Sequence, residues 1–73
     1  MNKSALLSRI EVNPDVMVGK PIIRGLRISV EHLLNALAGG RSAEDIIKDY
    51  PELEKEDIQA VLLYGGDFNQ SLN

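Results

Sequence analysis

SVEHLLNALAGGRSAEDIIKDYPELEKEDIQAVLLYGG, residues 29 to 66, decides the fold, because three helical patterns follow one another in it with short links. In the first pattern apolar side chains recur at helical spacing, at Val30, Leu33, Leu34, Leu37 and Ala38. Ser29 stands directly before this stripe, where its hydroxyl can accept a backbone N–H, and Gly39-Gly40 supplies a left-handed stop. These signals predict a helix over residues 30 to 38.

Two further helices are predicted downstream. Ser42 places a capping hydroxyl before acidic residues that suit the positive end of a helix dipole, and Pro51 ends that pattern. The next apolar pattern begins at about Lys55 and meets Gly65-Gly66, which we interpret as its end. The sequence therefore predicts helices near residues 43 to 50 and 55 to 64.

Upstream of these helices the pattern has a period of two, which is typical of short strands. Arg9 to Val12 alternates polar and apolar side chains, and isoleucines flank the turn signal Arg24-Gly25. Pro21 lacks the N–H that a central strand donates, so the strands belong at the edge of a sheet or in a two-stranded ribbon. The expected fold is mainly α, a small N-terminal β ribbon or hairpin followed by a three-helix bundle, in which the second and third helices form a helix-turn-helix candidate.

The expected organisation is one small domain. Residues 1–8 form a lead-in, residues 9–64 the domain, and residues 65–73 a flexible tail. The chain has 73 residues and no cysteine, which favours a reducing cytoplasm, and no apolar run approaches the roughly 20 residues of a membrane span. With only three aromatic residues the core must be aliphatic and thin, so we expect a homodimer.

Charge is distributed unevenly along the chain. Residues 1 to 41 carry six Lys/Arg and three Asp/Glu (+3), whereas residues 42 to 73 carry two and eight (-6), which gives the net charge of -3. The first half therefore offers a local basic face for DNA phosphates, from Lys20, Arg24, Arg27 and Arg41. The alternative is structural: Gly25 makes the turn with positive φ, while Arg24 and Arg27 pair with carboxylates of the acidic half or of a partner.

The start of the third predicted helix argues against its insertion into a DNA groove. It carries Glu54, Glu56 and Asp57, which phosphates would repel. Lys55 and Gln59 are its only useful donors, Gln59 being able to pair with adenine.

Catalysis is not expected. The chain offers one histidine, no cysteine and scattered serines, so no nucleophile, base and orienting group converge. His32 has no second metal ligand at suitable spacing, and Asp45 and Asp49 share a helix face without a third ligand. We expect no metal and no cofactor.

The stretches GKPIIRGLRISV and LLNALAGGRSAEDIIKDYPELEKEDIQAVLLY resemble the family catalogued as domain of unknown function 433, over about residues 9 to 64. The matching positions are Gly19, Lys20, Pro21, Arg24, Gly25, Arg27, Ile28, Val30, Gly40, Ser42, Tyr50, Pro51, Leu53, Asp57 and Ile58. The chain departs from the family pattern where Leu26 replaces threonine, Ser29 replaces proline and Glu54 replaces a threonine cap.

The resemblance implies a homeodomain-like or winged-helix-like fold and the role of a prokaryotic antitoxin, often paired with a PIN-like ribonuclease toxin. We therefore expect a binding module that occupies a toxin and binds its own operator. The alternative is a DNA-binding regulator without a toxin. The expected partner-binding residues are Leu26, as an exposed apolar side chain, and the spaced series Tyr64, Phe68 and Leu72, which either covers the core or orders on a partner.

Overall fold

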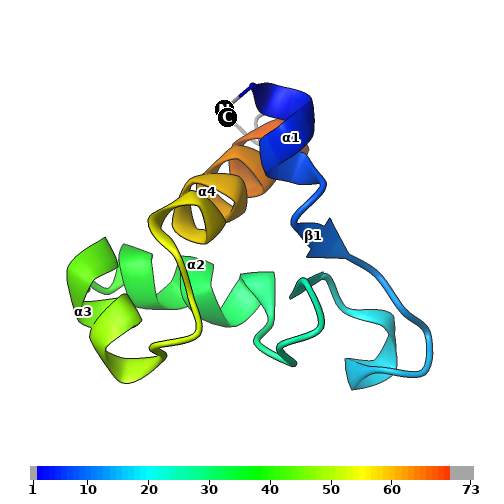
Figure 1. The fold of residues 1–73 in the computed structure, drawn as a ribbon, viewed down its shortest axis with the longest axis horizontal. Helices are drawn as coiled ribbons and strands as arrows, with labels where there is room; N and C mark the ends of the chain where they lie inside the picture. The colour runs from blue at the N-terminus through cyan, green and yellow to red at the C-terminus, as the bar shows by residue number, and fades with distance from the viewer. Residues whose placement is uncertain (1, 70–73) are drawn as a thin grey trace.

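The computed structural model describes residues 2–69, with side chains as far as residue 66, and this part of the chain is mainly helical (Figure 1). A short helix, α1 (Lys3–Leu7), precedes a two-stranded ribbon of β1 (Ile10–Glu11) and β2 (Ile22–Ile23). A short 3₁₀ helix, η1 (Met17–Gly19), lies between the two strands, and the remaining helices are α2 (Val30–Ala38), α3 (Ala43–Asp49) and α4 (Lys55–Asn69). Within residues 2–69, no helix combines the length and the apolar character that a bilayer span requires.

The caps that the sequence predicted form at α2 and α3. The Ser29 hydroxyl accepts the His32 N–H at 3.0 Å, and Ser42 and Asp45 make a reciprocal capping box. Gly40, at a φ of +98°, turns the chain out of α2 in the left-handed region. The two predicted helices are therefore confirmed, with the second ending at Asp49.

The predicted end of the third helix is wrong, because α4 continues through both glycines to Asn69. Gly65 is buried against α2, and a Cβ at this position would lie 2.9 Å from Leu34 Cδ2. The glycine thus permits close approach of two helices, where the sequence suggested a helix stop. The predicted tail overlaps this helix, and its last residues, 70–73, lie outside the described part of the chain.

The lead-in contains a helix that the sequence analysis missed. The Asn2 side chain accepts the Ala5 N–H at 2.8 Å and so caps α1. A helix of five residues is too short to be stable alone, and α1 packs along α4 (Figure 1). Tertiary packing therefore holds α1 in place.

The ribbon is antiparallel, with Ile10 opposite Ile23 and Glu11 opposite Ile22. After β2 the chain turns at Gly25, whose φ is +77°, and the Ile23 N–H donates to the Ile28 carbonyl at 3.0 Å. The predicted turn at Gly25 is therefore confirmed. It places Arg24 beside the first turn of α4.

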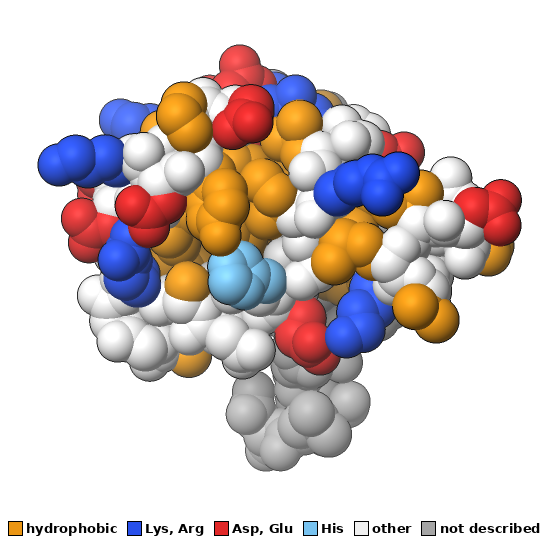
Figure 2. Space-filling view, turned by 90° about the horizontal axis from the view of Figure 1, so that it is seen from below, with side chains coloured by type: hydrophobic (Ala, Val, Ile, Leu, Met, Phe, Trp, Pro, Cys, Tyr) orange, Lys and Arg blue, Asp and Glu red, His pale blue; other side chains and the backbone are white. Residues whose placement is uncertain are grey.

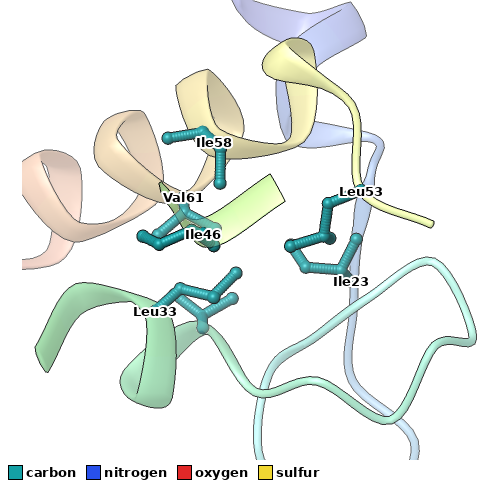
Figure 3. Packing of buried hydrophobic residues seen from close by; sticks show 7 residues of the cluster. Ile23, Leu33, Ile46, Leu53, Ile58 and Val61 are labelled. Carbon is teal, nitrogen blue, oxygen red and sulfur yellow. The ribbon is translucent and has the colours of Figure 1, made fainter. Parts of the chain in front are cut away.

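The core is aliphatic and joins the ribbon to the helices (Figure 3). Side chains from β2, α2, α3, the link between α3 and α4, and α4 meet in it, and the labelled ones are Ile23, Leu33, Ile46, Leu53, Ile58 and Val61. Burial of such side chains drives the association of elements that are each too short to persist alone.

Candidate functional site

Asp57, in the first turn of α4, is the centre of an ionic cluster, and its side chain is fully buried. Its Oδ1 accepts hydrogen bonds from Arg9 Nη1 and Arg24 Nε, both at 3.0 Å. Its Oδ2 accepts from Arg24 Nη2 and from the Glu54 N–H, both at 2.8 Å. The buried carboxylate is therefore fully hydrogen-bonded, as a charge in a core requires.

Local structure explains how these groups meet. Asp57 reaches back to the N–H of Glu54, the residue directly before α4, as a third-position acid does in a capping box. Arg24 follows β2 and Arg9 precedes β1, so the ribbon brings both guanidinium groups to the same carboxylate. The four side chains, Arg9, Arg24, Glu54 and Asp57, form what we call the arginine–carboxylate cluster.

Glu54 is the exposed anion of this cluster. Its Oε1 accepts from Arg9 Nη1 at 2.8 Å and lies 3.7 Å from Arg24 Nη2, while 57% of its side chain remains exposed. An open cavity of about 470 Å³ lies beside it, lined by Ala5, Ser8, Arg9, Arg24 and Glu54. The cluster thus has a buried half at Asp57 and a half that faces solvent.

The pKa values of the cluster follow from these contacts. Burial acts to raise the pKa of Asp57, but hydrogen bonds from Arg24, the Glu54 N–H and Arg9 outweigh it and hold that pKa below its usual range. The hydrogen bond to Glu54, and then that to Asp57, raises the pKa of Arg9. The hydrogen bond to Asp57 raises the pKa of Arg24. Arg9, Arg24 and Asp57 are therefore charged at neutral pH.

The cations expected to contact DNA are mostly engaged within the protein. Lys20 Nζ lies 3.4 Å from Glu31 Oε1, Arg24 pairs with Asp57, and Arg41 pairs with Asp49. The structural alternative for Arg24 is therefore confirmed. Figure 2 shows Lys and Arg side chains interspersed with Asp and Glu on the viewed face.

Arg27 and Gln59 differ from these paired cations. Arg27 is exposed, has a φ of +59° and makes no ion pair within the described residues, so its predicted pairing with the acidic half of the chain is not found there, and pairing with a partner stays a prediction. Gln59 is exposed on α4. The five predicted DNA-binding residues come from the ribbon loops, the link between α2 and α3, and α4.

The predicted partner-binding residues have different surroundings. Leu26 is half-buried and packs against the core, so the expectation of an exposed side chain is wrong. Tyr64 also packs there and lines an open groove with Pro21, Val30, Glu31, Leu34 and Asn35. The side chain of Phe68 and the whole of Leu72 lie outside the described part of the chain.

His32 contacts the side chain of Tyr50, the residue that follows α3. Its Nε2 lies 3.1 Å from the Tyr50 hydroxyl, and the two rings meet edge to face with centroids 6.0 Å apart. This contact ties α2 to the residue that follows α3. It gives the exposed histidine a role in packing.

The sequence analysis missed an apolar segment between the two strands, residues 12–18, which runs into the 3₁₀ helix η1 and which we call the apolar loop. Val12, Met17 and Val18 expose 59%, 39% and 94% of their surface. Met17 and Val18 also have φ values of +51° and +57°, and such left-handed backbone costs a non-glycine residue on the order of 1–3 kcal/mol. Residues 12–18 connect two paired strands but contain no glycine, so other residues must make the turns of the backbone. This was the signal that the sequence offered.

Comparisons with known proteins agree with this architecture. A curated relative, "Uncharacterized protein y4eO" of Sinorhizobium fredii (strain NBRC 101917 / NGR234), is 33% identical over 52 residues, 71% of this chain. The chain spans 24% of the length of that relative. The crystal structure of a DUF433 member protein from Anabaena variabilis ATCC 29413 superposes with a TM-score of 0.82 at 28% identity, covering 94% of this chain and 68% of that one.

The family model described as "Protein of unknown function (DUF433)" matches residues 10–65, from β1 to the buried glycine of α4. This match covers the ribbon, the core and the arginine–carboxylate cluster except Arg9. The resemblance noted in the sequence is thereby confirmed, and the chain belongs to the DUF433 family.

Proposed function

We propose that the chain is a non-catalytic, antitoxin-like binding module that acts in the cytoplasm as a homodimer and occupies a protein toxin, a PIN-like ribonuclease. The observation that carries this proposal is the apolar loop, in which Val18 exposes 94% of its surface. Exposed apolar groups held in a strained backbone are typical of segments that contact a partner. Binding would remove this apolar surface from water.

Charge also supports a protein partner over a polyanion. Three of the cations predicted to contact DNA, Lys20, Arg24 and Arg41, already pair with carboxylates. Each would have to exchange an existing ion pair for a phosphate, which reduces the gain from phosphate contacts.

Acidic side chains near the start of α4 suit a basic surface on the toxin. Glu52 and Glu54 are exposed, and Glu56 is half-buried. Such a group would mask the basic cleft in which a ribonuclease holds RNA. Asp57 takes no part, because its carboxylate is buried within the arginine–carboxylate cluster.

The test first asks whether the reading frame beside this gene encodes a PIN-like nuclease, and then produces that nuclease together with the chain. We expect the two proteins to copurify and the nuclease to be inhibited. A charge in the apolar loop, Val18→Asp, should weaken the complex by about tenfold or more, which corresponds to about 1.4 kcal/mol. Isothermal titration calorimetry measures this affinity.

Leu62→Asp is the matched control, because Leu62 is another exposed apolar side chain, at 52%, on α4. It introduces the same charge outside the apolar loop and should leave the affinity nearly unchanged. Equal affinity of Val18→Asp and wild type would show that the loop is not the contact. Absence of any complex with the neighbouring nuclease would remove the antitoxin proposal.

Arg27 favours a second candidate, a DNA-binding regulator without a toxin. Its guanidinium is exposed and carries no ion pair within the described residues. In this alternative α3 and α4 act as a helix-turn-helix unit that presents Gln59, and Arg27 contacts phosphate. Arg27→Ala should then lower the affinity for duplex DNA and reduce its salt dependence, whereas Lys3→Ala, on α1 and outside that unit, serves as the control in the same gel-shift assay.

A further inference from the structure

The arginine–carboxylate cluster has more hydrogen-bond donors than its carboxylates use. Arg24 pairs with Asp57 through its Nε and Nη2, the two nitrogens of one guanidinium edge. Arg9 uses Nη1 alone, for both Glu54 and Asp57. The Nε–Nη2 edge of Arg9, the same edge that binds a carboxylate in Arg24, therefore has no hydrogen bond within the described residues.

The position of Arg9 makes this unused edge significant. Its side chain as a whole is 18% exposed, its unpaired nitrogens are not buried, and it lines the open cavity between α1 and the start of α4. A guanidinium edge offers two parallel N–H donors that fit the two oxygens of a carboxylate or phosphate. Arg24 adds a second positive charge at the same cavity.

Glu54 is the weakly held member of the cluster. The Oε1 atom is its only side-chain contact with the arginines, whereas Asp57 is fixed through both oxygens. Because its side chain is 57% exposed, it can rotate into solvent at little cost. Two cations and the buried Asp57 then leave one net positive charge at the cavity.

We infer that this cavity binds one small oxyanion, a carboxylate or a phosphate group, on the Nε–Nη2 edge of Arg9, with Glu54 as the internal competitor. The acidic residues around α4's start restrict the ligand to a single compact anion, since each repels a longer polyanion. The affinity should be modest, on the order of millimolar, because the ligand shares the arginines with an existing carboxylate. The inference does not depend on the proposed function, because its test needs neither toxin nor DNA.

The experiment titrates nitrogen-15-labelled full-length protein with sodium phosphate and, separately, with sodium acetate, at constant ionic strength maintained with chloride. The Nε–Hε resonances of the arginines report on binding. We expect the Arg9 resonance to shift in a saturable way and the Arg27 resonance to stay in place. A lower Kd for phosphate identifies a phosphate site, and a Kd for acetate that is equal or lower identifies a carboxylate site.

Three variants complete the test. Glu54→Gln removes the competitor and should lower the Kd about two- to fivefold, the range of an exposed ion pair. Glu56→Gln removes the same charge two residues further along the chain. Because Glu56 makes no ion pair with Arg9 or Arg24 within the described residues, this variant should change the Kd less. Arg9→Lys keeps the charge but removes the two-donor edge, and should abolish binding.

The inference is overturned if neither anion shifts the Arg9 resonance in wild type or in Glu54→Gln. It is also overturned if Glu54→Gln and Glu56→Gln change the Kd equally, because the effect would then be one of overall charge. Thermal melting of each variant verifies that it is folded before titration. If Arg9→Lys does not fold, the comparison of the two glutamate variants still decides the outcome.

Discussion

At the scale of single residues, Asp57 shows how a buried charge can specify an arrangement. Its carboxylate receives four hydrogen bonds and touches two guanidinium groups that are 33 and 48 residues away in sequence. A buried ion pair of this kind is costly to desolvate, and leaving one partner alone is more costly still. The cluster therefore fixes the ribbon against α4 in one orientation.

Replacement of Asp57 by asparagine should destabilise the protein strongly. Asp57→Asn leaves two guanidinium groups without their shared anion, and breaking a buried pair costs about 3–5 kcal/mol. Asp49→Asn is the control, because the Asp49 side chain is 55% exposed and its ion pair with Arg41 should contribute about 1 kcal/mol or less. Urea unfolding followed by circular dichroism measures both, and similar losses for the two variants would contradict a special role for Asp57.

The pH dependence of the free energy of unfolding should reflect the titration of the Asp57 carboxylate. The folded pKa of Asp57 lies below its unfolded value of about 3.9, so the unfolded state binds more protons in acid. The stabilisation by Asp57 is therefore complete above about pH 5 and is lost as the pH falls through the folded pKa.

The measurable consequence is that the stability difference between wild type and Asp57→Asn narrows below about pH 4. Urea unfolding at a series of pH values provides these differences. A difference that stays constant down to pH 2 would mean that Asp57 does not titrate in this window.

At the scale of elements, the crossing of α2 and α4 depends on a glycine inside a helix. A Cβ at Gly65 would lie 2.9 Å from Leu34 Cδ2 and 3.1 Å from Leu34 Cδ1, whereas a Cβ at Gly66 would meet nothing within 4 Å. Adjacent glycines in one helix thus have opposite surroundings. One permits helix contact, and the other faces solvent.

Alanine substitution should separate these two glycines. Gly66→Ala gains helix propensity and should stabilise the protein by up to about 1 kcal/mol. Gly65→Ala gains the same propensity but must displace the methyl groups of Leu34, so it should be the less stable variant of the two. Thermal melting of the pair is the measurement, and equal melting temperatures would contradict the close crossing.

The position of Gly65 also changes what a C-terminal truncation would do. Deletion of residues 65–73, the segment expected from the sequence to be a flexible tail, removes a buried helix residue that packs on Leu34. Given the structure, this deletion should lower the melting temperature. Deletion of residues 70–73 leaves α4 whole and is the appropriate truncation for testing the tail in toxin binding.

At the scale of the whole molecule, stability rests on a thin core. The fully buried apolar residues within the described chain are Ile22, Ile23, Val30, Leu33, Ile46, Leu53, Ile58, Ala60 and Val61. Small domains bury a low fraction of their surface and are marginal alone. The ribbon has the order β1-β2, so β1 has one edge without a strand partner in the described residues.

We therefore predict that the chain forms a dimer at micromolar concentration. Analytical ultracentrifugation should show a species of twice the 8.0 kDa protomer mass, and the melting temperature should fall on dilution. A single 8.0 kDa species with a melting temperature independent of concentration would contradict the dimer.

Local signals in the sequence determined much of this protein. Ser29 and Ser42 cap helices through their own hydroxyls, Gly25 turns with positive φ, and the apolar stripe of α2 faces the core. Each of these depends on residues within a few positions, so sequence spacing alone specifies it. The aliphatic composition of the core followed in the same way from the shortage of aromatic residues.

Tertiary structure decided the features that depend on distant partners. In sequence, Asp57 belongs to an acidic, solvated helix start, yet Arg9 and Arg24 make it the buried centre of the cluster. In sequence Gly65 indicates the end of a helix, yet α4 continues through it, and the missing side chain lets it lie against Leu34 of α2. Burial and close approach arise between segments far apart in the chain, and a local pattern carries no information about which segments will meet.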